Sequence, residues 1–276
     1  NSLPWGEDMI RAIVAGAGGR MGGRIINIIE ADKDITLAAA FEKKGSRFAG
    51  QDAGIVAGLN RALGIIVQEG LEGVIDEGDV LIDFTFHEAT LNHARIAAGA
   101  KKPMVIGTTG LSAAEIDEIR NLARSFPCVL APNMSVGVNL LYKLVEMAAK
   151  TLGDDYDIEI IEAHHRMKKD APSGTALQIG RVAAAAVGRK LEEVGVYARH
   201  GLIGERTAKE IGIQTVRAGD IVGEHTVLFG GIGERIELVH KASSRDTFAK
   251  GAVRAAKWVV GKGPGLYDMQ DVLGLK

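Results

Sequence analysis

Short apolar runs alternate with amphipathic stretches from residue 10 to about residue 135, and this alternation most restricts the folds open to the chain. Strands are predicted at residues 10–15, 35–41, 64–68, 79–85, 102–107 and 129–131. Helices are predicted at residues 24–31, 87–100 and 113–125, and Ser112 and Glu115 form a capping box at the start of the last one. Because parallel strands need a crossover connection, the alternation predicts an α/β domain with a doubly wound parallel sheet.

The first predicted strand runs into a glycine turn, Gly-Ala-Gly-Gly-Arg-Met-Gly at residues 16–22. Its first two glycines match the dinucleotide-binding fingerprint, whereas the third fingerprint position holds Met21. A strand, a glycine turn and a helix start together form a phosphate cradle. The second strand ends at Glu42, where an acid would bind a ribose hydroxyl, but Lys43 and Lys44 follow and offer a partner for a 2′-phosphate instead. The structural alternative is a tight turn that closes an ordinary parallel unit.

Ligands of such sheets bind beyond the carboxyl ends of the strands. Four of these ends carry small or polar residues, at positions 16–22, 42, 107–109 and 131–134. They form the candidate nucleotide site. His87 and His93, on the helix at residues 87–100, are interpreted as surface residues. Cys128 lies in an apolar run and is interpreted as a buried strand thiol.

The pattern changes after a predicted amphipathic helix at residues 139–152. A strand is predicted at residues 156–161, a helix at 176–187 and a short strand at 194–199. Three strand-like runs at residues 211–216, 222–229 and 234–240 then follow without helices between them, which predicts an antiparallel meander. One of its faces packs on the helices, and the open face is a candidate subunit contact. Residues 246–260 are helical again, and we expect the segment from there to the end to return to the first domain.

The segment from Glu162 to Thr175 joins a strand to a helix and carries two imidazoles, two ammonium groups and a helix start. The backbone N–H groups of the first helical turn and the helix dipole favour a carboxylate or phosphate, and Gly174 would let such a ligand approach closely. Lys168 and Lys169 add positive charge. His164 is the natural proton carrier. His165 need not share that role, because adjacent side chains of a strand point to opposite faces.

Structural readings of this segment remain open at this point. A histidine pair at a strand end is commonly a hydrogen-bonded structural feature, and a lysine pair is commonly solvated surface. A metal site is disfavoured, because the histidines lack helical spacing and no second cluster of ligands accompanies them.

Composition excludes several classes of function. The formal net charge of −2 and a pI of about 6.4 give no sign of nucleic-acid or membrane-surface binding. No apolar run reaches the length of a membrane span, and no signal peptide is visible. The single Cys128 excludes an intrachain disulfide and fits a reducing compartment. Residues 1–8 are interpreted as an extension outside the fold.

Six motifs stand out together. They are Gly-Ala-Gly-Gly-Arg-Met-Gly (16–22), Asp-Phe-Thr (83–85), Gly-Thr-Thr-Gly (107–110), Ala-Pro-Asn-Met-Ser-Val-Gly-Val-Asn (131–139), Glu-Ala-His-His-x-x-Lys-x-Asp-Ala-Pro-Ser-Gly-Thr (162–175) and Arg-x-Gly-x-Ile-Val-Gly-Glu-His (217–225). With these motifs the chain resembles the 4-hydroxy-tetrahydrodipicolinate reductase (dihydrodipicolinate reductase) family from about residue 9 to its end. The His-His motif is the most specific of the six, and the glycine turn is far less specific.

The resemblance implies a cytoplasmic reductase of the diaminopimelate route to lysine, which uses NADH or NADPH to reduce a cyclic imine dicarboxylate. It implies that His164 is the proton donor and Lys168 its partner. The substrate would be held by His165, Gly174 and Thr175. The implied cofactor site consists of Gly16, Ala17, Gly18, Gly19, Arg20, Met21, Glu42, Lys43, Gly107, Thr108, Thr109, Ala131, Pro132, Asn133 and Met134.

The same resemblance implies the organisation of the chain. Residues 9–135 and 243–276 would form a Rossmann-type dinucleotide-binding domain. Residues 136–242 would form an α+β domain with a mixed or antiparallel sheet, which binds substrate and holds a homotetramer together. Relatives with an arginine after the ribose-binding acid favour NADP, whereas Lys43 provides a single point charge, so we expect use of both cofactors.

Two other classes of function are weaker interpretations. Another nucleotide-dependent dehydrogenase of amino-acid metabolism, acting on aspartate semialdehyde or homoserine, would need a nucleophilic cysteine in the first case and no His-His-x-x-Lys segment in the second. A nucleotide sensor without turnover would have no use for a proton donor beside an anion site.

Overall fold

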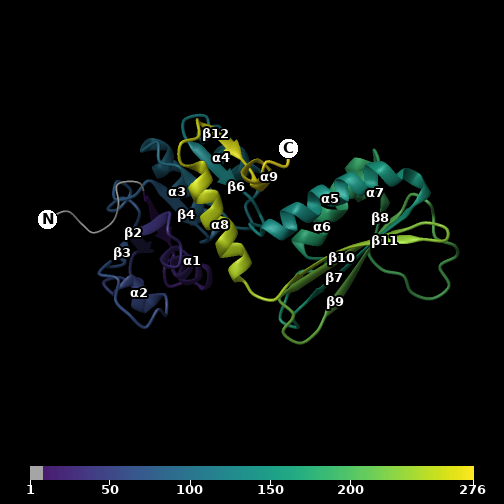
Figure 1. Ribbon diagram of the computed structural model, residues 1–276, viewed down its shortest axis with the longest axis horizontal. Helices are drawn as coiled ribbons and strands as arrows, with labels where there is room; N and C mark the ends of the chain where they lie inside the picture. Colours follow the sequence, from purple (N-terminus) through teal and green to yellow (C-terminus); the bar gives the residue numbers. More distant parts are fainter. Residues whose placement is uncertain (1–8) are drawn as a thin grey trace. The chain divides into compact units, whose positions relative to one another are not determined.

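The computed structural model describes residues 9–276, so the interpretation of residues 1–8 falls outside it. The chain forms two compact units (Figure 1). Unit 1 contains the described residues up to Ser135 together with Asp246–Lys276, and unit 2 contains Val136–Arg245.

Unit 1 is built on a seven-stranded sheet. Its strands are β1 (Ile10–Ala15), β2 (Ile35–Glu42), β3 (Gln68–Glu69), β4 (Val80–Asp83), β5 (Met104–Ile106), β6 (Pro127–Leu130) and β12 (Gly265–Tyr267), in the order β12-β6-β5-β4-β1-β2-β3. Every neighbouring pair is parallel, which confirms the predicted doubly wound sheet. The chain leaves β1 toward β3 and then returns to β4 on the other side of β1, so the topological switch point lies between β1 and β4.

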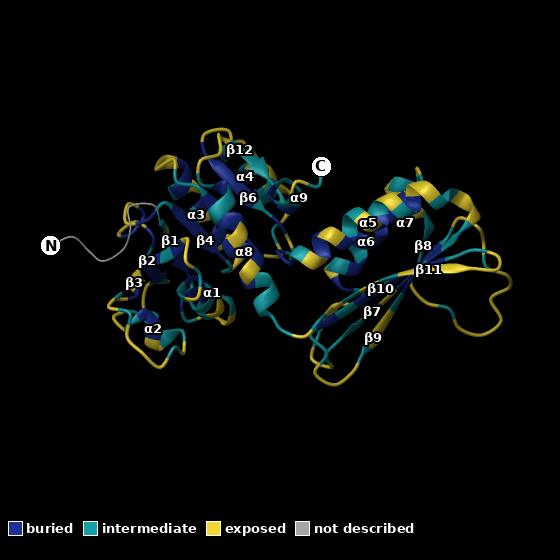
Figure 2. Cartoon of the chain, viewed as in Figure 1, coloured by how far each residue is buried: buried dark blue, intermediate teal, exposed yellow. Residues whose placement is uncertain are grey.

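Helices cover both faces of this sheet. They are α1 (Arg20–Glu30), α2 (Ala53–Val56), α3 (His87–Gly99), α4 (Ala113–Leu122), α8 (Asp246–Val259) and α9 (Met269–Leu273). One apolar cluster contains Ile25 of α1 and Val253 of α8, and a second contains Ala97 of α3 and Ile119 of α4. Figure 2 shows the strands between them as buried. Cys128 in β6 is fully buried, and burial raises the pKa of its thiol, which confirms the predicted inert strand thiol.

Two elements of unit 1 differ from the sequence expectation. Helix α1 begins at Arg20 rather than at residue 24, because Gly22 packs directly on the glycine turn: a Cβ there would lie 2.0 Å from the Gly16 carbonyl oxygen. The predicted strand at residues 64–68 is mostly loop. The Asp52 carboxylate accepts the N–H groups of Gly64 and of the residue before it, and these bonds keep the segment out of the sheet.

Unit 2 contains a five-stranded mixed sheet. Its strands are β7 (Asp157–His164), β8 (Gly195–Val196), β9 (Ile211–Arg217), β10 (Gly223–Gly230) and β11 (Arg235–Ala242), in the order β11-β10-β7-β9-β8. This mixed sheet confirms the expected sheet of the second domain, and β10 and β11 pair antiparallel as the predicted meander requires. The predicted pairing of β9 with β10 is wrong, because β7 lies between them and pairs with β9 in parallel. The turn from β9 to β10 therefore crosses the carboxyl end of β7, where the Ala218 N–H donates to the His164 carbonyl at 3.0 Å.

One face of this sheet packs on helices and the other face is open. The helices are α5 (Val136–Leu152), the short 3-10 helix η1 (Gly153–Asp155), α6 (Gly174–Ala186) and α7 (Leu191–Val194). Ile158 and Ile160 of β7 point toward the helices and are buried. On the open face, Ile161, Val216 and Val239 are 41%, 43% and 51% exposed. The strand registers place Ile161 and Val239 on either side of Thr226, and Val216 lies opposite Ala163 on β9, so the three apolar side chains are spread across this face.

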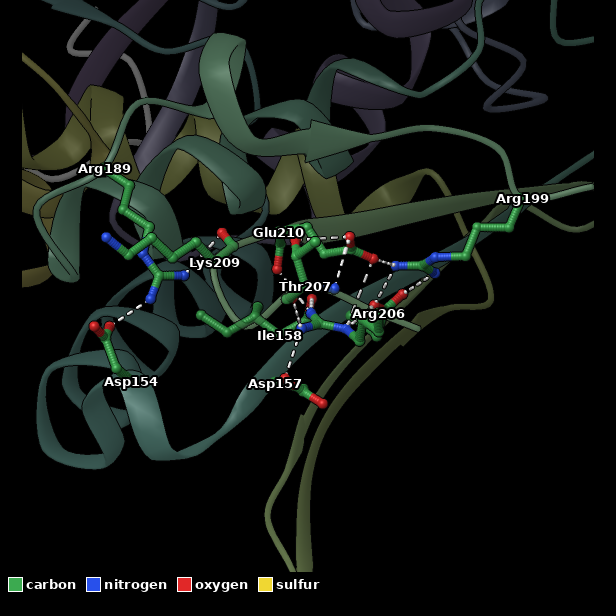
Figure 3. Close-up of polar contacts among 10 residues, drawn as sticks. Asp154, Asp157, Ile158, Arg189, Arg199, Arg206, Thr207, Lys209 and Glu210 are labelled. Atoms are coloured by element: carbon green, nitrogen blue, oxygen red, sulfur yellow. Dashed lines mark hydrogen bonds and ion pairs between the residues drawn. The ribbon is translucent and has the colours of Figure 1, made fainter. Parts of the chain in front are cut away.

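A charged cluster covers the other end of the open face. Arg199 and Arg206, from the long segment before β9, both donate to the Glu159 carboxylate (Figure 3). Arg199 also contacts Glu210. Glu159 lies across Gly212 of β9, where a Cβ would be 1.9 Å from a carboxylate oxygen. These contacts fasten the segment to the sheet beside β8 and leave Ile161 and its neighbours uncovered.

The packing of Gly22 gives a stability prediction. Gly22→Ala should destabilise the protein by roughly 1–3 kcal/mol, because the added methyl group collides with backbone rather than with a movable side chain. Gly23→Ala is the matched control: its nearest atoms would lie at 3.5 Å, so it should stabilise the helix by about 0.5–1 kcal/mol. Thermal unfolding measures the stability of both variants. An equal change in the two unfolding free energies would contradict the packing role of Gly22.

Candidate active site

The carboxyl end of β7 places an imidazole and a carboxylate on the same face of the sheet. His164 is the last residue of the strand and Glu162 lies two residues before it. The Nδ1 atom of His164 lies 2.6 Å from Oε2 of Glu162, whose side chain is fully buried. His165 begins the following loop and lies outside the alternation of the strand.

The Glu162 carboxylate joins three elements. Arg217, the last residue of β9, donates to both of its oxygens at 2.8 and 2.9 Å. The backbone N–H of Ser173, at the start of α6, donates to Oε1 at 2.9 Å, and the Thr215 hydroxyl does so at 3.3 Å. The parallel register pairs His164 with Arg217, so the position of β9 beside β7 creates this arrangement.

These contacts set the protonation of both groups. Burial alone would raise the pKa of Glu162, but hydrogen bonds from Arg217, His164 and one backbone N–H outweigh burial and lower the pKa to about 2. Burial lowers the pKa of His164, and the Glu162 carboxylate opposes that shift only in part. The charges of Lys168 and Arg217 lower the pKa of His164 further. Without a ligand, the imidazole is therefore biased toward its neutral form.

A second histidine holds the ring of His164 from the neighbouring strand. The ring of His225 in β10 meets it edge to face, with centroids 5.3 Å apart. Burial, followed by the nearby His164, lowers the pKa of His225 to about 3, so His225 is neutral. Its Nε2 lies 3.2 Å from the Ser173 hydroxyl. Gly223 borders the free side of the His164 ring, where an added Cβ would lie 3.1 Å from Nε2.

The start of α6 only partly matches the expectation of exposed N–H groups. Ser173 caps the helix by accepting the Ala176 N–H, and its own N–H is used by Glu162. Gly174 is exposed, and among the described residues no atom lies within 4 Å of where its Cβ would be. The side chain of Thr175 hydrogen-bonds to Tyr142 of α5. Gly174 is thus the most accessible part of this turn.

The lysines of the loop differ in their surroundings. Lys168 is 21% exposed in its side chain and pairs with Asp170 at 2.9 Å, whereas Lys169 is exposed. His165 is half-buried, and its carbonyl accepts the Lys168 N–H at 3.0 Å. The structure therefore brings Lys168 close enough to His164 to influence its charge.

In unit 1, the glycine turn and Glu42 lie together. Gly16 has a φ of +65°, which favours glycine, and Gly19 is the N-cap of α1 without any side-chain cap. The Gly18 N–H donates to the Glu42 carboxylate at 2.9 Å. The ring of Phe48 packs on Gly18, where a Cβ would lie 2.1 Å from the ring. Arg20 and Lys43 are exposed, Met21 is half-buried and Ala17 is fully buried.

A buried polar network lies at the ends of β4 and β5. The fully buried Asp83 accepts hydrogen bonds from Thr85 at 2.6 Å and from Thr90 at 3.1 Å. The Thr108 hydroxyl is buried in the same network, 2.7 Å from Thr90. His93 also belongs to it, with Nδ1 2.7 Å from Asp83, so its interpretation as a surface residue is wrong. Helix α3 places the His93 side chain against the carboxyl end of β4, where Asp83 lies.

Other predicted cofactor residues divide by exposure. Thr109 and Pro132 are exposed and Asn133 is half-buried. Gly107 is buried under the ring of Phe84, and a Cβ there would lie 2.1 Å from that ring. Ala131 and Met134 are both buried side chains of the apolar core, so they can offer a ligand only backbone atoms. His87, the other predicted surface histidine, is partly exposed and pairs with Glu115.

Within residues 9–276, no cluster of three or more His, Cys, Asp or Glu side chains could hold a metal ion. No helix in the same range is long and apolar enough to cross a membrane.

Sequence reasoning missed three residues around His164. Glu162 stood inside the singled-out segment, and its spacing from His164 along a strand was the signal for a shared face. Arg217 and His225 stood in a motif more than fifty positions away. Only the insertion of β7 between β9 and β10 brings them to His164.

The chain is similar to known proteins over nearly all of its length. The family models for the N-terminus and the C-terminus of dihydrodipicolinate reductase match residues 10–134 and 137–273. A 4-hydroxy-tetrahydrodipicolinate reductase of Syntrophus aciditrophicus (strain SB) is 60% identical, over 97% of this chain and 100% of the relative. One of Desulfotalea psychrophila (strain LSv54 / DSM 12343) is 61% identical, over 97% and 99%. The solved structure of a dipicolinate-bound dihydrodipicolinate reductase from Paenisporosarcina sp. TG-14 is 26% identical, with a TM-score of 0.76 over 95% of this chain and 98% of that one.

Proposed function

The chain belongs to the dihydrodipicolinate reductase family, and we propose that His164 is the proton donor of its reaction. The protein catalyses the NADH- or NADPH-dependent reduction of 4-hydroxy-tetrahydrodipicolinate to tetrahydrodipicolinate, in the diaminopimelate route to lysine. The observation that supports the assigned role is the hydrogen-bonded pair of His164 and the buried Glu162, next to the accessible start of α6.

The overall conversion removes the 4-hydroxyl group as one water molecule, and its reductive step adds a hydride to one ring atom and a proton to another. His164 is suited to transferring the proton because its Nδ1 is held by Glu162, so that Nε2, which borders Gly223, is the nitrogen left to exchange it. A bound dianion adds negative charge near the ring and raises the pKa of His164, so substrate binding itself loads the proton donor. The loop thus prepares the acid only when the substrate is present.

Two carboxylates of the substrate require cations and backbone donors nearby. We assign Lys168 to one of them, since its ammonium group lies on the loop and affects the charge of His164. His165, Gly174 and Thr175 are assigned to substrate binding, because the exposed Gly174 opens a helix start whose dipole favours an anion. Dipicolinate is the ligand named for the Paenisporosarcina structure, and it is a dicarboxylate of this kind.

Unit 1 has the features that a dinucleotide requires. The turn bends at Gly16 with positive φ, and α1 starts at Gly19 without a side-chain cap, so its first N–H groups suit a phosphate. The Glu42 carboxylate reaches the turn and is suited to a ribose hydroxyl. Arg20, Met21 and Lys43 are accessible to the same ligand, and residues 107–109 and 131–134 are assigned to the nicotinamide half. When bound, the nicotinamide supplies the hydride.

The competing dehydrogenase interpretations lack a chemical basis in this structure. A semialdehyde dehydrogenase needs a nucleophilic thiolate, whereas Cys128, the single cysteine of the chain, is fully buried and burial raises its pKa. A sensor without turnover would not need the acid-loading arrangement around His164. A homoserine-type enzyme would not need it either.

We also propose a cytoplasmic homotetramer that assembles through the open face of the unit 2 sheet. The support is that the apolar side chains of Ile161, Val216 and Val239 on three strands of this face are all exposed, as expected of a face that a second subunit covers. Sedimentation at equilibrium tests this proposal, and a monomer at micromolar concentration would contradict it.

Substitution of His164 and Lys168 tests the assigned roles. His164→Ala should lower kcat by about 100-fold or more with a small change in KM, because a general acid acts on the chemical step. Lys168→Met should lower kcat and raise KM together. The matched control is Lys169→Met, which removes the adjacent exposed lysine and should change both constants little. Wild-type turnover in His164→Ala would remove the proton-donor assignment.

The Glu42 carboxylate sets a cofactor prediction. Glu42→Ala should raise KM for NADH by about 10-fold, since a charged hydrogen bond to the ribose is lost. The KM for NADPH should change less, because its 2′-phosphate is repelled by the same carboxylate. The matched control is Glu69→Ala, the exposed residue that pairs with Glu42 on the neighbouring strand. Equal effects on the two cofactors would count against the ribose contact.

A further inference from the structure

The buried Glu162 has no evident part in binding the substrate, because a carboxylate repels a dianion. It nevertheless lies at the centre of the site. We infer that Glu162 is a positioning residue, which holds the His164 ring with Nδ1–H toward the protein and Nε2 toward the substrate. Arg217 limits how strongly Glu162 stabilises the protonated imidazole. The inference rests on the proposed role of His164.

The geometry fixes which nitrogen exchanges a proton. Glu162 is ionised, so it accepts hydrogen bonds and donates none. Its Oε2 lies 2.6 Å from Nδ1 of His164, and this nitrogen therefore keeps its hydrogen in both charge states of the ring. Proton gain and loss then fall to Nε2. Gly223 borders Nε2, and a Cβ at this position would crowd it at 3.1 Å.

The ring is also held sideways. His225 meets it edge to face, with an angle of 74° between the ring planes. His225 is in turn fixed by the Ser173 hydroxyl, and the Ser173 N–H binds the other oxygen of Glu162. The same carboxylate therefore orients the imidazole and connects it to the helix start that is assigned to the substrate.

Arg217 adjusts the strength of this contact. Its guanidinium donates to both oxygens of Glu162, and it is itself anchored by the Asp170 carbonyl at 2.6 Å. The negative charge of Glu162 is thereby shared between the Arg217 guanidinium and the His164 imidazole. Without Arg217, the carboxylate would stabilise the imidazolium more strongly and slow its release of the proton. Without Glu162, Arg217 would face His164 as an unpaired cation.

Charged and titratable groups approach the His164 ring from four elements. They are Glu162 from β7, Lys168 from the following loop, Arg217 from β9 and His225 from β10. Since His225 is neutral and Lys168 is common to all the variants below, the balance between Glu162 and Arg217 controls the comparison.

The test is the pH dependence of kcat, followed as NADH oxidation with saturating substrate. Above a certain pH, kcat falls because the imidazole has lost its proton, and this fall is the alkaline limb. Glu162→Gln should move the limb to lower pH by about one unit or more, and Arg217→Met should move it to higher pH by a similar amount. A general loss of structure would not move the alkaline limb in opposite directions in the two variants.

Matched controls come from an exposed ion pair of the same unit. Arg181 of α6 and Glu192 of α7 lie 3.5 Å apart on the surface. Arg181→Met and Glu192→Gln make the same two changes of charge there, and both should leave the alkaline limb where the wild type has it.

The outcomes separate this inference from the proposed function. If both site variants keep the wild-type limb and only lose stability or rate, the inference is overturned, while the role of His164 stands. If Glu162→Gln does not fold, Arg217→Met decides alone, and a limb at or below the wild-type pH overturns the inference. A limb that persists in His164→Asn overturns the role of His164 and the inference with it.

Discussion

The arrangement of unit 2 around His164 depends on the hydrogen bonds of one buried carboxylate, that of Glu162. Removing a charge from water is costly unless hydrogen bonds and an opposite charge compensate for it. Here the compensation comes from Arg217 of β9, His164 of β7 and the Ser173 N–H at the start of α6. Each partner is held in position by its hydrogen bond to the carboxylate. One buried charge therefore fixes the relative positions of β9, the start of α6 and the His164 imidazole.

The strand order of unit 2 makes this contact possible. Because β7 lies between β9 and β10, the turn that connects the two crosses the end of β7. Arg217 enters the site from one side of that turn and Gly223 from the other. The features of unit 1 have a different structural origin. Its glycine turn and Glu42 lie at the ends of adjacent parallel strands near the switch point. The buried carboxylate of unit 2 and the glycine turn of unit 1 thus have independent structural bases.

Much of this organisation could be predicted from the sequence, because local patterns encode it. Alternating apolar runs predicted the parallel sheet of unit 1, and the motif around His164 predicted the family. Local sequence patterns carry no information about the pairing of strands that are distant in the chain, which is why three consecutive strands predict a meander that the structure does not form. The same limitation hid Arg217 and His225, and it led to a surface interpretation of His93, which binds the buried Asp83 instead.

The protonation state of the His164 ring tests the central claim most directly. Nitrogen-15 NMR of histidine-labelled protein, with the His164 signals assigned by their loss in His164→Asn, reports which nitrogen carries hydrogen. The structure predicts that neutral His164 bears its hydrogen on Nδ1, facing Glu162, and that acidification changes the Nε2 resonance. A neutral ring protonated on Nε2 would show that Glu162 does not hold the imidazole, and it would contradict this account.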